Sequence, residues 1–271
     1  MFDIKGKVAI ITGGASGLGL SYAKELLRNE LHGITLVDID ENAGKTALMK
    51  IEKEFGTGRA VFVRSNISSK QEFEFAFRKT LETFNHIDIL INNAGIYSDL
   101  NWENEVDINI KGTINGIILG LETYLKNHKQ GEEAVILNTS SIAAIRPGPW
   151  MPIYGCTKAA IAGLTQSWGH DFHYERTKVR VVAICPGGTH TGLFQEKNCA
   201  LTSEYMVAQG ESKEKNGPDH RQSPDFVSEE VVKILKYAKN GSLWIVEFGE
   251  PAYQYVFPER ETFKENLIEK V

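Results

Sequence analysis

Short apolar segments alternate with longer amphipathic segments along almost all of this 271-residue chain, and this alternation restricts the fold more than any other feature. The short segments are mostly β-branched and continuously apolar, which is typical of strands covered on both faces. They occupy residues 8–11, 33–37, 60–63, 87–91, 134–138, 179–184 and 243–246. The helix-length segments between them occupy residues 17–29, 41–55, 70–84, 103–126, 153–175 and 228–238.

This order predicts an α/β fold of the Rossmann type, a doubly wound, seven-stranded parallel sheet with helices on both faces. No linker-like segment divides the chain, so we expect a single domain over residues 1–271. Residues 188–225 are polar and break the alternation, which predicts a lid over the site rather than another strand. Residues 243–271 form a C-terminal tail. Ligands of such sheets bind at the carboxyl ends of the strands.

Composition narrows the class of protein. The net charge of −5 argues against a nucleic-acid partner, which usually requires a basic patch. The apolar runs are too short for a membrane span, and the N-terminus does not have the pattern of a secretory signal. The three cysteines are an odd number without metal-ligand spacing, as is usual in a reducing compartment. We therefore expect a soluble, cytoplasmic protein.

A glycine-rich turn, TGGASGLG at residues 12–19, follows the first predicted strand directly and opens a helix. Glycines at 13, 17 and 19 allow the backbone to turn sharply and to approach a pyrophosphate, and the helix N-terminus offers free N–H groups. An ordinary tight turn is the alternative for such a cluster by itself. No Lys-Ser/Thr pair follows the glycines, so a nucleoside-triphosphate loop is excluded.

Asp38 ends the second predicted strand, about twenty residues beyond the glycines, where a carboxylate accepts the ribose hydroxyls of adenosine. A 2′-phosphate at this position would face the Asp38 carboxylate, and Ala15, Ser16 and Ile39 offer no compensating positive charge. The sequence therefore predicts that the cofactor is NAD rather than NADP.

The glycine spacing G-x-x-x-G-x-G resembles that of the short-chain dehydrogenase/reductase family, and the resemblance covers nearly the whole chain. NNAG at residues 92–95 resembles the family's motif on the adenosine side of the cofactor. VAICPGGTHT at residues 182–191 resembles its nicotinamide segment, where Thr191, and more weakly Thr189, match the threonine. Together these motifs imply that the cofactor is held by Gly13, Gly17, Leu18, Gly19, Asp38, Asn66, Ile67, Asn93, Ala94, Gly95, Tyr154, Lys158, Pro186, Gly187, Thr189 and Thr191.

Tyr154 and Lys158, in the sequence YGCTK, lie at i and i+4 and so share one helix face. A phenol has a pKa of about 10, and a nearby ammonium lowers that value, so Tyr154 is a candidate proton acceptor near neutral pH. Most isolated Tyr-x-x-x-Lys pairs are only helix surface, but this pair follows a strand that ends in NTSS. By its family counterpart, Lys158 would also reach the nicotinamide ribose.

Two further residues complete the catalytic set that the resemblance implies. The family's serine lies thirteen positions before the tyrosine, which favours Ser141 as the donor to the substrate oxygen and leaves Ser140 a strand-end role. Asn109 lies within a long apolar helix, where an asparagine is unfavourable unless its amide has a task. In the family this residue holds a water that links the lysine to solvent. A capping or surface role is the alternative for Asn109.

Other polar residues are weaker candidates. His170 and His173 are at i, i+3 near a helix end, where histidines usually face solvent rather than bind metal. Cys156 is a small packing residue, and we expect no metal. Asn66 stands where the family usually has an aspartate against adenine, a departure that weakens an adenine contact without abolishing binding.

The segments NNAGIYSDLNWE at 92–103 and GSLWIVE at 241–247 resemble the 15-hydroxyprostaglandin dehydrogenase and insect-type alcohol dehydrogenase branches. That resemblance implies a secondary, lipid-like or terpenoid alcohol oxidised with NAD. Bulky residues near the tyrosine, Trp150 and Phe194, are expected to join Ser141 and Tyr154 in contacting an apolar alcohol or ketone. The aromatic tail is expected either to cover the substrate or to pack on another subunit of a homodimer or homotetramer.

Two other functions remain open. A catalytically silent NAD-binding sensor or partner protein would have the same fold, although it needs no complete set of Tyr154, Lys158, Ser141 and Asn109. An epimerase or dehydratase of the family's extended relatives would carry a large C-terminal substrate domain, which this chain lacks. The sequence thus favours an alcohol dehydrogenase.

Overall fold

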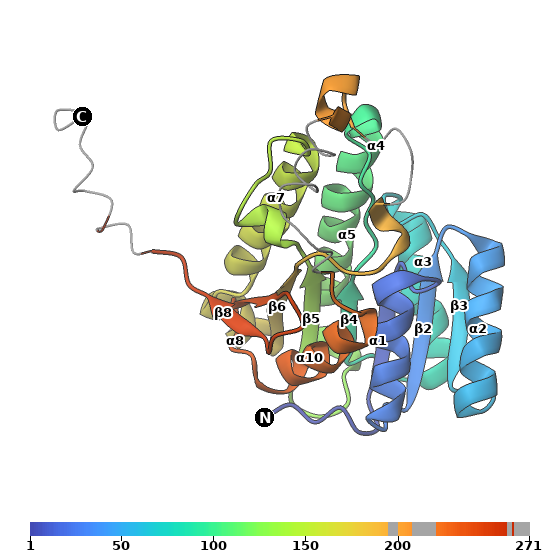
Figure 1. Ribbon diagram of the computed structural model, residues 1–271. Helices are drawn as coiled ribbons and strands as arrows, with labels where there is room; N and C mark the ends of the chain where they lie inside the picture. Colours follow the sequence, from blue (N-terminus) through green and yellow to red (C-terminus); the bar gives the residue numbers. More distant parts are fainter. Residues whose placement is uncertain (195–199, 208–220, 259–261, 263–271) are drawn as a thin grey trace.

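The computed structural model describes residues 1–194, 200–207, 221–258 and 262. One sheet of eight strands organises these residues, in the order β3-β2-β1-β4-β5-β6-β7-β8 (Figure 1). The strands are β1 (Val8–Thr12), β2 (Gly33–Asp38), β3 (Ala60–Arg64), β4 (Ile89–Asn92), β5 (Ala134–Thr139), β6 (Val179–Pro186), β7 (Leu243–Val246) and β8 (Tyr253–Tyr255). The predicted Rossmann-type α/β fold is confirmed.

The sheet has one strand more than the seven predicted. β1 to β7 are parallel, and β8 adds an antiparallel eighth strand along the edge of β7. β8 contains only three residues, which are exposed or half-buried, so it has none of the apolar character of the inner strands. Its extended state depends on the free edge that β7 offers, which is a tertiary feature.

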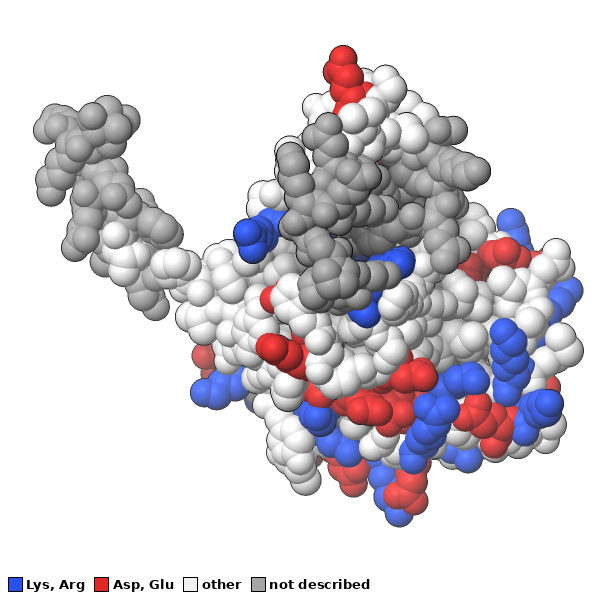
Figure 2. Space-filling view, viewed as in Figure 1, with Lys and Arg blue, Asp and Glu red and all other residues white. Residues whose placement is uncertain are grey.

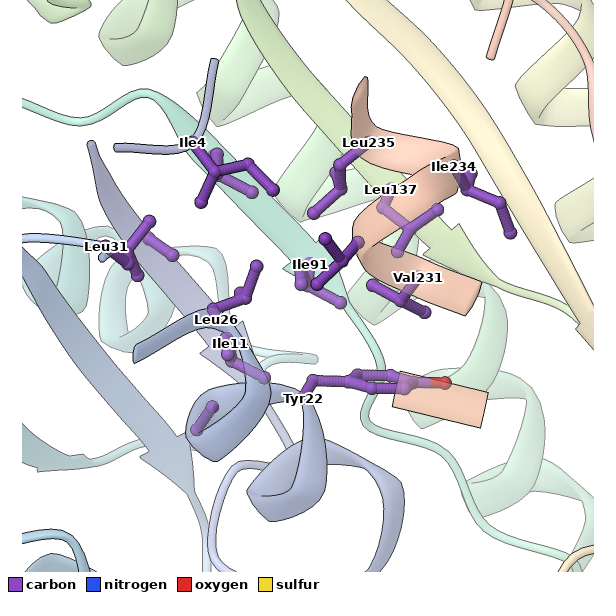
Figure 3. Close-up of a cluster of buried hydrophobic side chains, with 14 of the residues drawn as sticks. Ile4, Ile11, Tyr22, Leu26, Leu31, Ile91, Leu137, Val231, Ile234 and Leu235 are labelled. Carbon is purple, nitrogen blue, oxygen red and sulfur yellow. The ribbon is translucent and has the colours of Figure 1, made fainter. Parts of the chain in front are cut away.

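Helices cover both faces of the sheet. On one face lie α1 (Gly17–Arg28), α2 (Glu41–Phe55) and α10 (Pro224–Tyr237), whose apolar side chains share a buried cluster with the central strands. Figure 3 shows Tyr22 and Leu26 of α1 beside Val231 and Leu235 of α10, with Ile11, Ile91 and Leu137 of the sheet. On the other face lie α3 (Lys70–Phe84), the helical run 102–128 and α7 (Pro152–Trp168).

The predicted helix 103–126 is a continuous helical run with two wider, π-helical segments. It comprises α4 (Trp102–Val106), η2 (Asp107–Gly112), α5 (Thr113–Ile118), η3 (Leu119–Tyr124) and α6 (Leu125–His128). Small residues allow it to lie close to the sheet. A Cβ on Gly116 would lie 2.1 Å from Oδ1 of Asn92. Asn109 lies in the first π-helical segment, a kind of distortion that is frequent at functional sites.

The predicted helix 153–175 is two helices, α7 and α8 (Asp171–Thr177), separated at Gly169 and His170. A Cβ on Gly169 would lie 2.2 Å from Cα of Gly241, so the chain packs there backbone to backbone. His170 caps α8 by accepting a hydrogen bond from the Phe172 N–H at 3.2 Å, and His173 packs against Trp168. Within the described residues, no group of three His, Cys, Asp or Glu side chains is placed to hold a metal.

The predicted lid, residues 188–225, is described only in part, since 195–199 and 208–220 lie outside the described residues. Thr189 bridges to Gln222, and residues Gly192–Phe194 form a short 3₁₀ turn. The surface around α1 and α10 carries interspersed acidic and basic side chains (Figure 2). Among the described helices, none has the length and apolar character that crossing a bilayer requires.

Candidate active site

The glycine-rich turn after β1 is shaped by positions that leave no room for a side chain. Gly13 and Gly17 have φ of +63° and +51°, a region that favours glycine. A Cβ on Gly19 would lie 2.2 Å from the Gly13 carbonyl oxygen. The turn therefore exposes bare backbone at the N-terminus of α1, where Ser16 makes no side-chain capping bond. Such a cradle fits a pyrophosphate.

The NNAG motif ties the end of β4 to this turn. The Thr12 hydroxyl accepts hydrogen bonds from the backbone N–H groups of Asn93 and Ala94 at 2.9 and 3.0 Å. The Asn93 side chain donates to the Thr12 carbonyl at 3.0 Å. The two motifs, far apart in the sequence, thus lie together at the ends of the neighbouring strands β1 and β4, where the order of the strands reverses.

Asp38 at the end of β2 faces the same turn. Its Oδ2 accepts from the Ala15 N–H and its Oδ1 from the Asp40 N–H, both at 3.1 Å.

Asn66 bonds locally to Ser68, accepting from its N–H at 3.0 Å. The adjacent loop is held by Asn115, whose amide donates to the Ile67 carbonyl at 2.9 Å. This role of Asn115 was not predicted from the sequence, because nothing in its local pattern indicates the Ile67 carbonyl as its partner.

Tyr154, Lys158 and Ser141 come together at the carboxyl end of β5. The Lys158 ammonium lies 5.5 Å from the centroid of the Tyr154 ring and donates to the Thr139 carbonyl at 3.1 Å. Ser141 hydrogen-bonds the Tyr154 phenol. The Ser140 hydroxyl instead donates to the Lys158 carbonyl at 2.8 Å, the strand-end role expected from its position.

The electrostatics of this group are dominated by burial. Burial lowers the pKa of Lys158 to about 8, although the nearby Glu105 carboxylate opposes the shift. Burial also raises the pKa of Tyr154 above the usual value for a phenol; the hydrogen bond from Ser141 lowers it and Glu105 adds to the rise. From the sequence, Lys158 was expected to lower the Tyr154 pKa. Burial, which disfavours the charged phenolate, reverses the direction of that shift.

Asn109 is fully buried and its amide is fully hydrogen-bonded. Its Oδ1 accepts from the Ile96 N–H at 2.9 Å, and its Nδ2 donates to the Ile96 carbonyl at 2.9 Å and to the Thr157 hydroxyl at 3.0 Å. A Cβ on Gly95 would lie 3.2 Å from both Asn109 Oδ1 and Lys158 Nζ. Asn109 therefore joins the loop after β4 to the helix that carries Tyr154.

The loop after β6 lies on the side of the site that faces the glycine-rich turn. The Thr189 hydroxyl donates to the Gly187 carbonyl at 2.9 Å, and the Leu193 N–H donates to the Thr191 hydroxyl at 3.4 Å. A Cβ on Gly17 would lie 3.6 Å from the Thr191 Cβ, so this loop faces the glycine turn.

These segments enclose one cavity of about 450 Å³. The predicted site residues that line it are Gly13, Gly17, Leu18, Asp38, Asn66, Ile67, Asn93, Ala94, Gly95, Ser141, Tyr154, Lys158, Pro186, Gly187, Thr189 and Thr191. Gly19, Asn109 and Trp150 lie outside the lining. Gly148 is so close to the Trp150 ring that a Cβ on it would meet that ring at 3.0 Å. The side chain of Phe194 lies outside the described part of the chain.

Tyr97 is a lining residue that sequence reasoning did not single out. It is buried, its ring meets the Tyr154 ring edge-on at a centroid distance of 5.6 Å, and its hydroxyl donates to the Trp150 carbonyl at 3.3 Å. Its position two residues after NNAG was the available signal, since whatever follows that motif lies at the carboxyl end of β4.

Comparisons with known proteins agree with this geometry. The family model "short chain dehydrogenase" matches residues 7–201. Human 15-hydroxyprostaglandin dehydrogenase [NAD(+)] is 34% identical over 74% of this chain and 77% of that protein. Alcohol dehydrogenase 1 of Ceratitis capitata is 29% identical over 91% of this chain and 94% of its own. The chain therefore belongs to the short-chain dehydrogenase family.

Solved structures support the same fold. A short-chain dehydrogenase/reductase from Burkholderia phymatum, in complex with NAD, has a TM-score of 0.75 at 24% identity and covers 87% of this chain and 88% of that one. The 3-ketoacyl-(acyl-carrier-protein) reductase of Brucella melitensis, complexed with NADH, has a TM-score of 0.73 at 25% identity over 91% and 98%.

Proposed function

We propose that this chain is an NAD-dependent dehydrogenase that interconverts an apolar alcohol and its carbonyl compound, with Tyr154 as the acid/base group. The observation that carries the proposal is the meeting of Tyr154, Ser141 and Lys158 in the same cavity as the glycine cradle. The human relative, whose name specifies NAD(+) and a hydroxyl substrate, supports the cofactor and the reaction class.

The residues divide the work as follows. The bound nicotinamide supplies the hydride acceptor. The Tyr154 oxygen takes the hydroxyl proton of the alcohol, while Ser141, which already accepts from the Ala143 N–H at 3.1 Å, keeps its proton and donates a hydrogen bond to the substrate oxygen. With a pKa of about 8, Lys158 is mostly protonated at neutral pH, and its charge favours the phenolate. Alcohol oxidation should increase, and ketone reduction decrease, as pH rises, because oxidation requires the deprotonated Tyr154 oxygen and reduction requires the protonated one.

Asp38 is proposed to select NAD. It is the one anionic side chain among the described residues that line the cavity, and Lys158, at the opposite end, is the one cation. We expect kcat/KM with NAD to exceed that with NADP by about 100-fold or more, because like charges in contact cost several kcal/mol.

In Asp38→Ala the ratio of kcat/KM with NAD to kcat/KM with NADP should fall at least about tenfold, since the repulsive charge is removed. Glu41→Gln is the matched control: its carboxylate is close in sequence but pairs with Lys45 at the surface, so the ratio should not change. Steady-state kinetics with both cofactors give the result. A native preference for NADP would contradict the assignment of Asp38.

The substrate is proposed to be apolar because Ile96, Tyr97, Ile108 and Leu193 line the cavity, and Tyr97 and Leu193 pack with Tyr154. We expect kcat/KM to rise along a series of secondary alcohols of increasing chain length. Leu193→Ala should reduce that rise, because its side chain lies in the cavity wall. Trp150→Ala should lower stability without changing the preference, because Trp150 packs on Gly148 outside the lining.

Both variants, Leu193→Ala and Trp150→Ala, are assayed with the same series of alcohols. If the chain-length preference changed in Trp150→Ala and not in Leu193→Ala, the substrate contact that the sequence predicted for Trp150 would be supported instead. A preference for polyols would contradict the apolar assignment. If NAD bound tightly while no alcohol was oxidised, the chain would be a non-catalytic sensor instead.

A further inference from the structure

The helix that carries Tyr154 receives its N-terminal cap from a distant part of the chain. Met151, at the capping position of α7, makes no side-chain capping bond. Asp99, 54 residues before Ile153, supplies the acceptors: its Oδ2 accepts from the Ile153 N–H at 3.0 Å and its Oδ1 from the Tyr154 N–H at 2.9 Å. Asp99 is fully buried. One carboxylate thus holds the peptide groups that place Tyr154.

A second fully buried carboxyl group, Glu105 of α4, adjoins the first. Its Oε2 accepts from the Ser98 N–H at 3.0 Å, whereas its Oε1 meets no donor among the described residues. Ser98, whose N–H this carboxyl group binds, directly precedes Asp99, and the side chains of Glu105 and Asp99 interact with each other. Two carboxylates in such a site cannot both be charged without a large cost, and one shared proton removes the conflict. Burial, with Asp99 adding to the effect, raises the pKa of Glu105 to about 7.

We propose that Asp99 and Glu105 share one proton and act as a positioning pair for Tyr154, an inference that rests on the acid/base role proposed above. With the proton on Glu105, its O–H donates to Asp99, whose charge remains directed at the start of α7. When the proton leaves, a second negative charge appears in the same buried site and opposes formation of the Tyr154 phenolate.

The charged groups around Glu105 are few. Asp99 faces it from the preceding turn, and Lys158 and Tyr154 face it from α7. The charged residues of the adjoining π-helical segment, Asp107 and Lys111, pair with each other at the surface at 3.5 Å. Lys158 favours ionised Glu105, but burial and Asp99 outweigh this attraction.

Glu105→Gln tests the shared proton directly. Glutamine keeps the shape and the donor of a protonated glutamate but cannot ionise, so kcat at pH 6 should be close to native. At higher pH the native enzyme gains a charge that the variant lacks. The midpoint of the pH profile for alcohol oxidation should therefore shift to lower pH in Glu105→Gln, by about 0.5 unit or more.

Two comparisons separate this effect from a structural one. Asp107→Asn removes an exposed carboxylate close in sequence and should leave the profile unchanged. Glu105→Ala removes the donor and should lower kcat at every pH.

Asp99→Asn tests the cap. An amide has one acceptor oxygen for the two N–H groups of Ile153 and Tyr154, so kcat should fall at least about tenfold through misplacement of the phenol. The dissociation constant for NAD, measured by titration without substrate, should remain near native, because Asp99 does not line the cavity.

The outcomes are decisive even if Asp99→Asn fails to fold. An unchanged pH profile in Glu105→Gln overturns the inference. The inference is also overturned if Glu105→Gln loses as much kcat at pH 6 as Glu105→Ala does, since Glu105 would then act as a carboxylate. If Tyr154→Phe kept native turnover, the proposed function itself would be wrong. This failure can be distinguished from failure of the inference, because Tyr154→Phe leaves Asp99 and Glu105 intact.

Discussion

Tyr154→Phe is expected to lower the turnover number by about 10²- to 10⁴-fold, the usual contribution of a general acid/base group. The change removes only the hydroxyl that exchanges the substrate proton. The ring stays in its buried position against Tyr97, so packing is retained. The dissociation constant for NAD should remain close to native. Steady-state kinetics and a cofactor titration measure the two quantities.

Tyr97→Phe is the matched control, because it removes a hydroxyl from the neighbouring ring in the same cavity. That hydroxyl donates to the Trp150 carbonyl, so turnover should stay within a few-fold of native. Near-native turnover in Tyr154→Phe would move the acid/base role to another residue. The rise of alcohol oxidation with pH should also disappear in Tyr154→Phe.

Gly19→Ala is expected to abolish measurable NAD binding. The added Cβ would lie 2.2 Å from the Gly13 carbonyl oxygen and 2.7 Å from Nδ2 of Asn93. Both neighbours belong to the cradle, and one is backbone, so the glycine turn itself must shift. Isothermal titration with NAD measures the loss, and thermal unfolding shows whether the fold survives.

Gly163→Ala is the control for this substitution. Gly163 is exposed within α7, and a Cβ there meets nothing within 4 Å. The variant should bind NAD as the native chain does and gain about 0.5–1 kcal/mol of stability from the better helix propensity of alanine. Retained NAD affinity in Gly19→Ala would show that the cradle is not the pyrophosphate site.

Features with a local signature could be predicted from the sequence. The inner strands are apolar runs, and every residue of β1, β4, β5 and β6 is buried. Helix periodicity placed Tyr154 and Lys158 on one face of a helix, and the glycine spacing indicated a turn with positive φ values, which favour glycine. The boundaries were less exact, since Gly169 ends one helix and His170 starts another.

Features that depend on distant partners were decided by the tertiary structure alone. No local pattern reports that Trp150 lies close to Gly148 and outside the cavity lining. The sign of the Tyr154 pKa shift depends on burial, which no local pattern reports. Nothing in the local sequence distinguishes Asp99 from other acidic residues in loops, yet it caps the helix that carries Tyr154, whose first residues lie 54 positions further along the chain. Local patterns determine which elements form, because backbone preferences and hydrophobic periodicity act over a few residues. Hydrogen bonds and burial between distant segments exist only after those elements have packed together.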